Sequence, residues 1–408
     1  MSIFSQPDYL LFIVVSTVID LVVAIAILFF RLPPSLQAIL PASVRKLISP
    51  RLTMGRCIFA AGLTGAVWLI KSIVAFVALD LSVFAIITLA YVHIVISLPL
   101  LGVLVLRSGS VEIDGVGTRA RATALVRTCA LLALLGLPVG VYASFIEPNT
   151  IVLERTHVAL PGERAGDDLI TIAVLSDVQT DRMTEKHLEL TERVMALAPD
   201  IIIIPGDFYE PSAGLDGHDW DDFENQEHRF RAFLKGLAAP GGVYFIEGNC
   251  ELQYDARSML EGTDVVLLDD ATTTIKYGDR KILLAGAGYE LQSDRGRAFR
   301  ETLLDDIESN DDAIVLLVSH VPDSILHLPP DARIDLTIAG HTHGGQVQVP
   351  GYGPIFTASD VPRDIAAGGL SEFRGNRIYV SRGVGLERGQ APALRLFCPP
   401  EISLITLQ

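Results

Sequence analysis

The chain is poor in cysteine, tryptophan and basic residues. Its 408 residues include 4 Cys and 2 Trp, and 32 Lys and Arg stand against 48 Asp and Glu, a formal net charge of −16. Cys57, Cys129, Cys250 and Cys398 lie far apart, which describes neither a disulfide framework nor a cysteine zinc cluster. The shortage of cations argues against non-specific nucleic-acid binding, because phosphate backbones require a basic face.

The charge is divided unevenly along the chain. Residues 1–146 carry ten Lys and Arg and five Asp and Glu, net +5, whereas residues 147–408 carry 22 and 43, net −21. The mean hydropathy of +0.41 is also high for one soluble domain. We therefore expect two parts, a transmembrane region at 1–146 and a soluble domain at 147–408.

The first part contains four apolar stretches, near 9–30, 57–79, 82–106 and 128–145. Each is about the 20 residues that a membrane-spanning helix needs. The basic residues gather between the first and second stretches and between the third and fourth, which predicts that these two loops are cytoplasmic. With four spans, the protein would be an integral cell membrane protein whose acidic domain lies outside the cytoplasm. Buried helices of a soluble protein are the alternative.

Three ionisable residues, Asp20, Lys71 and His93, fall inside the predicted spans. Such groups are costly in a bilayer and face a partner or a wet cavity. Pairing between helices and a role in transport are both open.

In the acidic part, short apolar runs alternate with helical stretches, which indicates an α/β domain. Five of these runs end in polar residues, in "LSDVQ", "IPGDF", "IEGNCE", "VSHVP" and "AGHTHGG". The carboxyl ends of strands in an open α/β sheet meet at one crevice. The side chains expected there are Asp177, Gln179, Asp207, Asn249, Cys250, His320, His341 and His343. This mixture of oxygen and nitrogen ligands favours divalent cations.

The order of these motifs resembles the calcineurin-like metallophosphoesterase superfamily, in its membrane-anchored bacterial branch. The resemblance covers roughly residue 147 to the C-terminus. It implies a four-layer α/β/β/α sandwich, two divalent metal ions and hydrolysis of a phosphoester by a metal-activated hydroxide. Carried over by position, Asp177, Gln179, Asp207 and His343 would hold one metal. Asp207 would bridge to a second metal held by Asn249, His320 and His341.

Two positions depart from the family pattern. Gln179 stands where the family has histidine, and its oxygen favours Mn²⁺ over softer ions, although Mg²⁺, Zn²⁺ or Fe are possible. Cys250 replaces a histidine that assists the reaction, and a neutral thiol is a weaker proton donor than imidazolium. Stable leaving groups, as in phosphoanhydrides and activated diesters, suit this change. Arg382, in "YVSRGVG", is expected either to contact phosphate or to form a structural ion pair.

These features predict a membrane-anchored metal-dependent hydrolase with Asn249, Cys250 and Arg382 as catalytic candidates. Its partners would be a phosphorylated small molecule or lipid and the bilayer itself, with no nucleic acid and no evident obligate protein partner. The alternative is a degenerate domain that binds a phosphorylated ligand without turnover and acts as a sensor.

Overall fold

A computed structural model describes residues 14–22, 39, 41, 65–74, 82–107, 119–166, 168–210, 213–214, 217–218, 220–289, 293–388 and 391–408. The chain divides into two compact units. Unit 1 contains Met1–Tyr142, Ala213–Gly217 and Gly389–Pro392. Unit 2 contains Ala143–Ser212, His218–Arg388 and Ala393–Gln408.

The N-terminal part of unit 1, up to Tyr142, is mostly helical where it is described. Its helices are 14–22, Gly65–Val74, α5 (Val83–Val92), η1 (His93–Ser97), α6 (Leu98–Arg107), α7 (Arg119–Leu134) and α8 (Gly136–Val141). By length and composition, the helices Val83–Val103 and Val126–Asn149 could cross a membrane. They correspond to the third and fourth predicted spans. The first two spans lie largely outside the described residues, so that four spans remain a prediction.

The three ionisable residues inside the predicted spans, Asp20, Lys71 and His93, lie beside one another. Asp20 Oδ2 lies 2.6 Å from Lys71 Nζ and 3.7 Å from His93 Nδ1. Lys71 also donates to the carbonyl of Ser16 at 3.0 Å. The structure therefore shows the pairing between helices, which lowers the cost of burying these charges.

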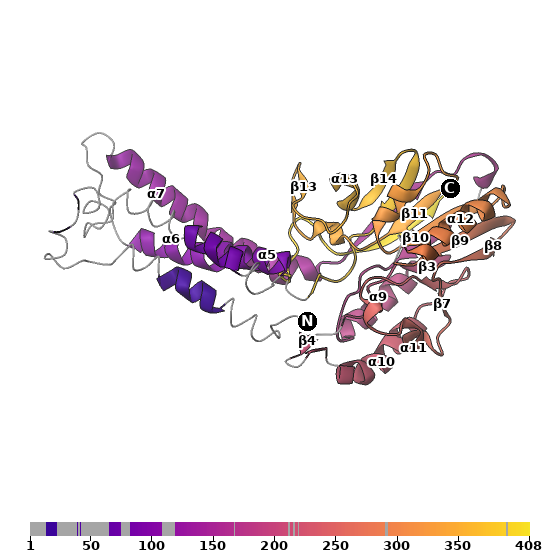
Figure 1. The fold of residues 1–408 in the computed structure, drawn as a ribbon, viewed down its shortest axis with the longest axis horizontal. Helices are drawn as coiled ribbons and strands as arrows, with labels where there is room; N and C mark the ends of the chain where they lie inside the picture. Colours follow the sequence, from indigo (N-terminus) through magenta and orange to yellow (C-terminus); the bar gives the residue numbers. More distant parts are fainter. Residues whose placement is uncertain are drawn as a thin grey trace. The chain divides into compact units, whose positions relative to one another are not determined.

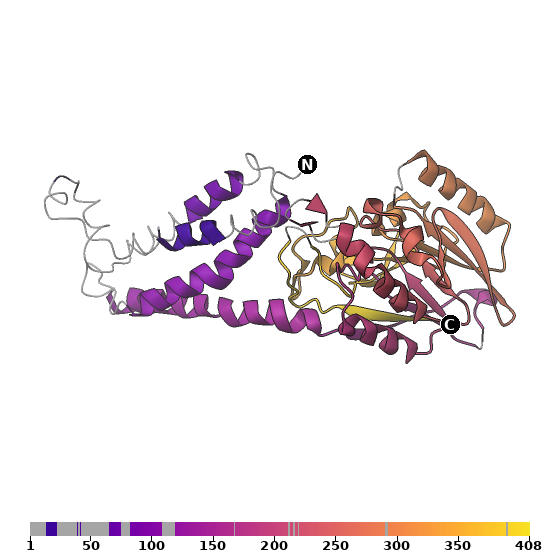
Figure 2. The ribbon, with the colours of Figure 1, turned by 90° about the horizontal axis from the view of Figure 1, so that it is seen from below.

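Unit 2 contains two six-stranded sheets (Figures 1 and 2). The first has the order β1 (Val152–Val158), β16 (Glu401–Leu407), β2 (Ile170–Val174), β3 (Ile201–Ile204), β6 (Val243–Phe245) and β7 (Val265–Leu267). Strands β2, β3, β6 and β7 are parallel, while β16 runs antiparallel to β2. The chain's last strand thus lies inside this sheet.

The second sheet has the order β14 (Gly369–Phe373), β15 (Asn376–Val380), β11 (Leu336–Ala339), β10 (Ile314–Ser319), β9 (Arg280–Ala287) and β8 (Ala271–Tyr277). Its four inner strands are parallel, and β14 and β8 flank them as antiparallel edges. Two short pairs complete the described strands, β4 (Ala213–Gly214) with β5 (Gly217–His218) and β12 (Gln348–Val349) with β13 (Gly353–Pro354).

Three apolar cores hold the layers together. Ile201 and Ile203 point into the core between the sheets, whereas Ile202 and Ile204 point into a core with the helices α9 (Glu185–Met195), α10 (Trp220–Lys235) and α11 (Ala256–Leu260). A third core joins the second sheet to α12 (Asp294–Glu308) and α13 (Arg363–Ala366). Strands buried on both faces read as continuous apolar runs, as "IIII" does. The expected mixed α/β fold is confirmed, with layers in the order helix, sheet, sheet, helix.

The parallel strands bring their carboxyl ends to one edge of the domain. The loops after β2 and β3 are joined by the Asp177 N–H, which donates to the Gly206 carbonyl at 3.2 Å. The loops of the second sheet are joined by the Gly340 N–H, which donates to the His320 carbonyl at 2.9 Å. The His341 N–H, 3.0 Å from Asp177 Oδ1, connects the two sheets.

Candidate metal centre

The loops at this edge have an unusual backbone. Five of the predicted ligand residues have positive φ angles: Asp177 (50°), Gln179 (40°), Asp207 (49°), His341 (70°) and His343 (48°). Non-glycine residues in this region cost on the order of 1–3 kcal/mol each and gather at functional sites. The residues that the motifs identified therefore have strained backbone conformations.

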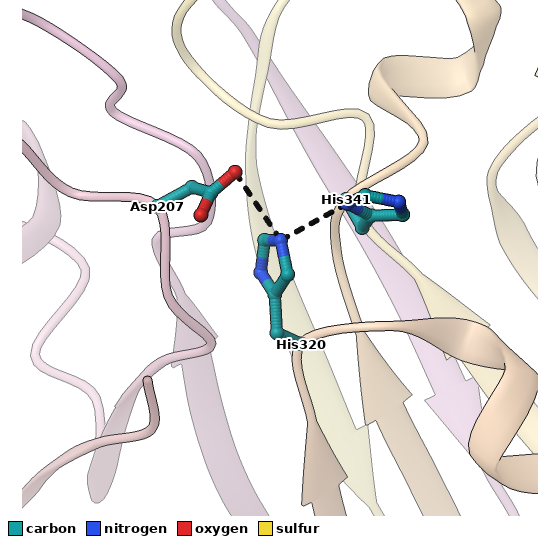
Figure 3. Close-up of side chains that lie close together, drawn as sticks. All are labelled: Asp207, His320 and His341. Carbon is teal, nitrogen blue, oxygen red and sulfur yellow. Dashed lines mark hydrogen bonds and ion pairs between the residues drawn. The ribbon is translucent and has the colours of Figure 1, made fainter. Parts of the chain in front are cut away.

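One group of side chains is centred on His320 (Figure 3). Its Nε2 lies 3.2 Å from Asp207 Oδ2, 3.1 Å from His341 Nδ1 and 3.2 Å from Asn249 Oδ1. One ligand atom each from Asp207, His320 and His341 lies within 4.8 Å of the others, close enough for one cation.

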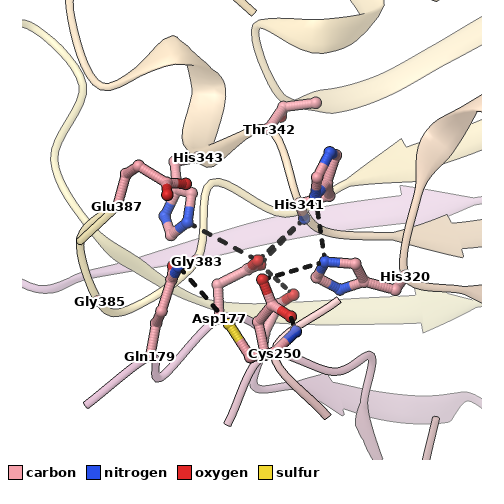
Figure 4. A network of polar contacts seen from close by, with 12 residues as sticks. Asp177, Gln179, Cys250, His320, His341, Thr342, His343, Gly383, Gly385 and Glu387 are labelled. Carbon is pink, nitrogen blue, oxygen red and sulfur yellow. Dashed lines mark hydrogen bonds and ion pairs between the residues drawn. The ribbon is translucent and has the colours of Figure 1, made fainter. Parts of the chain in front are cut away.

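A second group lies beside the first, around Asp177 (Figure 4). His343 Nε2 is 3.9 Å from Asp177 Oδ1, and Asp177 also accepts a hydrogen bond from the Ser176 hydroxyl. Gln179 adjoins Cys250, with 3.9 Å between Nε2 and Sγ. The structure thus brings together all seven predicted metal ligands and Cys250.

The free donor atoms fit a metal. His320 Nδ1 is 2.7 Å from the Pro205 carbonyl and His341 Nε2 is 3.0 Å from the Ala358 carbonyl. These contacts leave the other ring nitrogens facing the site, as hydrogen bonds to backbone carbonyls do for metal-binding histidines. Gln179 Oε1 and His343 Nε2 are buried and have no hydrogen-bond partner. Buried polar atoms rarely stay unpaired, so these two are available for a cation.

His343 differs from His320 and His341 because its Nδ1 atom lies next to an arginine. Its Nδ1 lies 3.3 Å from Nη2 of Arg395, a fully buried side chain. Arg395 also donates to the carbonyl oxygens of Gly385 and Arg382. Coordination through Nε2 of a neutral ring requires hydrogen on Nδ1, and the guanidinium then relies on its carbonyl acceptors alone.

When no metal ion is bound, a proton on His320 supplies the positive charge next to Asp207. Burial lowers the pKa of His320, but the charge and hydrogen bond of Asp207 outweigh it and raise that pKa to about 10. Burial raises the pKa of Asp207, and His320 more than reverses this, so that the carboxyl's pKa falls below its ordinary value. A cation between these residues competes with that proton, which makes binding pH-dependent.

The surrounding groups favour a cation further. Burial and the charge of His320 lower the pKa of His341 to about 4, so its ring is neutral at pH 7. Burial raises the pKa of Asp177 to about 7, of Glu210 to about 8 and of Glu387 to about 7. The neighbouring Gln179 amide offsets part of this rise in the pKa values of Glu210 and Glu387. These two glutamates were missed by motif analysis, because neither directly follows a strand in a recognisable pattern.

Comparison with known proteins identifies the domain that carries the site. Residues 170–345 match the model of the family described as calcineurin-like phosphoesterase. This segment is therefore a calcineurin-like phosphoesterase domain. The match spans the segment that supplies all seven predicted metal ligands.

Three relatives illustrate the breadth of the similarity. The Caenorhabditis elegans protein F40B5.2 is 26% identical over 292 residues, covering 68% of this chain and 56% of that protein. Escherichia coli "Phosphodiesterase YaeI" is 28% identical and covers 65% and 92%. Chlamydia muridarum "UDP-2,3-diacylglucosamine pyrophosphatase LpxG" is 24% identical and covers 68% and 96%. Family and relatives place this chain among the phosphoester hydrolases.

Glu251 holds two loops of the phosphoesterase site together through hydrogen bonds. Its carboxylate accepts hydrogen bonds from the N–H groups of Asp207 (2.8 Å), Phe208 (3.0 Å) and Gly248 (2.7 Å), and from the Tyr254 hydroxyl (2.6 Å). It therefore ties the loop after β3 to the loop after β6. The motif "GNCE" contains this residue, but only the contacts reveal its role.

Two glycines of the phosphoesterase motifs are required for space. A Cβ on Gly248 would overlap Asp207 Oδ1, and a Cβ on Gly340 would overlap Ser176 Oγ and Asp177 Oδ2. Glycine at these positions lets the backbone approach the carboxylates closely.

Cys250 and Asn249 lie at the site but differ in exposure. The Cys250 side chain is buried, and burial together with the charges of Asp207 and Glu210 raises its thiol pKa. The Cys250 N–H donates to Asp207 Oδ1 at 2.8 Å. Asn249 is half-buried, and its Nδ2 lies 3.7 Å from Cys250 Sγ. The thiol is therefore neutral at pH 7.

Arg382 forms the structural ion pair that was one of its two expected roles. Its guanidinium pairs with Glu401 Oε2 (2.5 Å) and Glu154 Oε2 (3.0 Å). Glu401 is buried, so it needs this charge as a partner. The other expected role of Arg382, a contact with phosphate, stays a prediction.

Proposed function

We propose that the protein is a membrane-anchored, metal-dependent hydrolase of phosphodiester or phosphoanhydride bonds. The observation that carries the proposal is the pair of ligand groups around Asp177 and around His320, which share the edge where Asp207 lies. A family resemblance alone would not distinguish an intact centre from a degenerate one. The unpaired donor atoms of Gln179 and His343 support an intact one.

The ligand sets follow from position. Asp177, Gln179, Asp207 and His343 would hold one cation, and Asp207, Asn249, His320 and His341 the other. Bound cations would lower the pKa of a water molecule and neutralise charge on the phosphoryl oxygens. Oxygen ligands dominate the first set, which favours Mn²⁺, with Mg²⁺, Zn²⁺ or Fe as alternatives.

The chain's own groups restrict the leaving group. Asn249 is half-buried and its amide can orient a phosphoryl oxygen. Cys250 is the group next to it, and its raised pKa makes it a poor proton donor to an alkoxide. The site therefore suits leaving groups that are stable without protonation, such as phosphates and aryl oxides.

Membrane attachment suggests the substrate. The two apolar helices support an anchor, and the basic loops of the first part favour a catalytic domain outside the cytoplasm. Two relatives are named as a phosphodiesterase and a UDP-2,3-diacylglucosamine pyrophosphatase. A phosphorylated lipid or lipid-linked diphosphate is the substrate class that combines these features.

The test compares matched carboxylate variants of the full chain in detergent. With Mn²⁺, the unmodified chain should hydrolyse bis-p-nitrophenyl phosphate, and Asp207→Asn should lose this turnover. Asp311→Asn, at a carboxylate whose side chain is 97% exposed, should retain it.

The sensor alternative has a distinct outcome. A chain that binds Mn²⁺ and a phosphorylated ligand, yet turns over neither diesters nor pyrophosphates, would refute the hydrolase proposal. Equal activity in Asp207→Asn and Asp311→Asn would instead refute the assignment of the site.

A further inference from the structure

An uncharged segment follows the last metal-binding histidine. From Val347 to Ser359 the sequence "VQVPGYGPIFTAS" contains no charged residue. It lies in a part of the chain with 22 basic and 43 acidic residues, where such a stretch is conspicuous. Strands β12 and β13 form its hairpin, which Figure 1 places beside α13.

Large apolar side chains of this segment are exposed. Exposed fractions are 42% for Val349, 58% for Tyr352 and 63% for Ile355, and 59% for the neighbouring Phe397. We call these four residues the hairpin patch. Gathered apolar groups of this kind mark a contact surface on soluble domains.

The patch borders an open groove of about 740 Å³ that contains one basic side chain, Arg363, and one acidic side chain, Asp364. The guanidinium of Arg363 lies 4.1 Å from the centre of the Tyr352 ring. An aromatic ring and a cation next to aliphatic side chains are the residues that anchor proteins at the bilayer interface. Tyr352 and Arg363 thus give the groove residue types that are common at the bilayer interface.

The patch is connected to the point where the apolar helix enters unit 2. The Arg395 N–H donates to the Ala143 carbonyl at 2.9 Å, and the Leu396 carbonyl accepts from the Gln348 N–H at 2.9 Å. Ala143 lies in the apolar helix Val126–Asn149, which is long enough to cross a membrane. Phe145, two residues further on, is itself 71% exposed. Within unit 2, the helix end and the hairpin are therefore linked by one strip of backbone.

We propose that the hairpin patch docks into the interfacial layer of a lipid bilayer. The bilayer is favoured over a protein partner, because backbone hydrogen bonds link the hairpin to the end of a membrane-length helix within unit 2, and because Tyr352 lies beside Arg363, a pair typical of that interface. Acidic faces of the domain would be repelled by anionic lipids, whereas this face, where the charges of Arg363 and Asp364 offset each other, can approach them.

Docking has a consequence for the site. The Ala358 carbonyl, at the end of the same segment, is 3.0 Å from His341 Nε2. A hairpin held at the bilayer would therefore bring the centre close to lipid headgroups. This step rests on the proposed hydrolase function, whereas docking itself does not.

The experiment uses the full chain in nanodiscs of phosphatidylethanolamine and phosphatidylglycerol. A photo-crosslinking residue, p-benzoylphenylalanine, replaces Tyr352 or Ile355 in separate variants. In the matched control it replaces Val266, which is 46% exposed on β7. Samples are illuminated first and extracted with alkaline carbonate afterwards, and adducts are identified by mass spectrometry.

We expect lipid adducts at positions 352 and 355 and none above background at 266. Crosslinks from 352 to a second copy of the chain, adducts equal to those at 266, or no adduct would each overturn the inference. Extraction by carbonate would refute the proposed anchor, and loss of turnover would concern the hydrolase proposal, so that these failures are distinguishable.

Discussion

Glu251 offers the sharpest test of how the site is built. Replacing it with alanine removes the acceptor for the buried N–H groups of Asp207, Phe208 and Gly248. Each unsatisfied buried donor costs about 1–3 kcal/mol, so that losing the acceptor for three of them in Glu251→Ala should cost about 3–9 kcal/mol of stability. Typical domains have only about 5–15 kcal/mol in total. We therefore expect this variant to fold poorly.

Glu251→Gln makes the test interpretable. The amide oxygen can keep the two donors at Oε2, from Asp207 and Gly248, whereas its NH₂ group would face the Phe208 N–H. The NH₂ group and the Phe208 N–H are both donors, so that neither has an acceptor, and the stability of the fold should fall by about 1–2 kcal/mol. For a domain of this size, the melting temperature should fall by roughly 2–8 °C.

The assay is thermal unfolding of the full chain in detergent, followed by limited proteolysis. The control is Glu261→Gln, the same change at an exposed glutamate, which should melt like the unmodified chain. Identical melting of Glu251→Gln and Glu261→Gln would show that the carboxylate does not hold the loops, and the account of the site would be wrong.

Three further outcomes follow from the geometry. Gln179→His should raise Zn²⁺ affinity relative to Mn²⁺ in calorimetry, because imidazole is a softer ligand than an amide oxygen; unchanged selectivity would contradict this. Glu210 has a pKa raised to about 8 by burial, so that its protonated form stabilises the metal-free fold. That contribution is complete below the unfolded pKa, near 4.5, and is lost as pH rises through about 8. Melting of the chain in EDTA should therefore fall with pH across this window, and less steeply in Glu210→Gln; equal slopes would refute it. Gly340→Ala should abolish Mn²⁺ binding, since the added methyl overlaps the Asp177 carboxylate, whereas Gly166→Ala, facing only the flexible tip of Arg280, should bind normally.

Much of the site's location could be predicted from sequence. The strand "IIII" is buried on both faces, and Asp207 follows it by a short turn, so that parallel-sheet geometry alone places this carboxylate at the shared edge. The histidines of "GHTHGG" are placed by the same rule. Periodicity and strand order thus suffice where a residue directly follows a strand.

Residues that act through distant contacts escaped this reasoning. Glu387 reaches the centre from a loop more than 200 residues beyond its neighbour Gln179. Arg382 is followed by the glycines of its motif, yet its partners Glu154 and Glu401 come from the distant strands β1 and β16. No local pattern reports which carboxylate an arginine will meet, because that pairing is a property of the folded sheet.

The placement of β16 bears on how the protein is made. Residues Glu401–Leu407 pair with β1 on one side and β2 on the other, although nearly 250 residues separate β1 from them. At synthesis rates of roughly 5–20 residues per second, β2 waits on the order of tens of seconds for its neighbour. Until Glu401–Leu407 is synthesised, the edges of β1 and β2 that it covers are open to mispairing, so that a chain lacking this strand could not close the sheet.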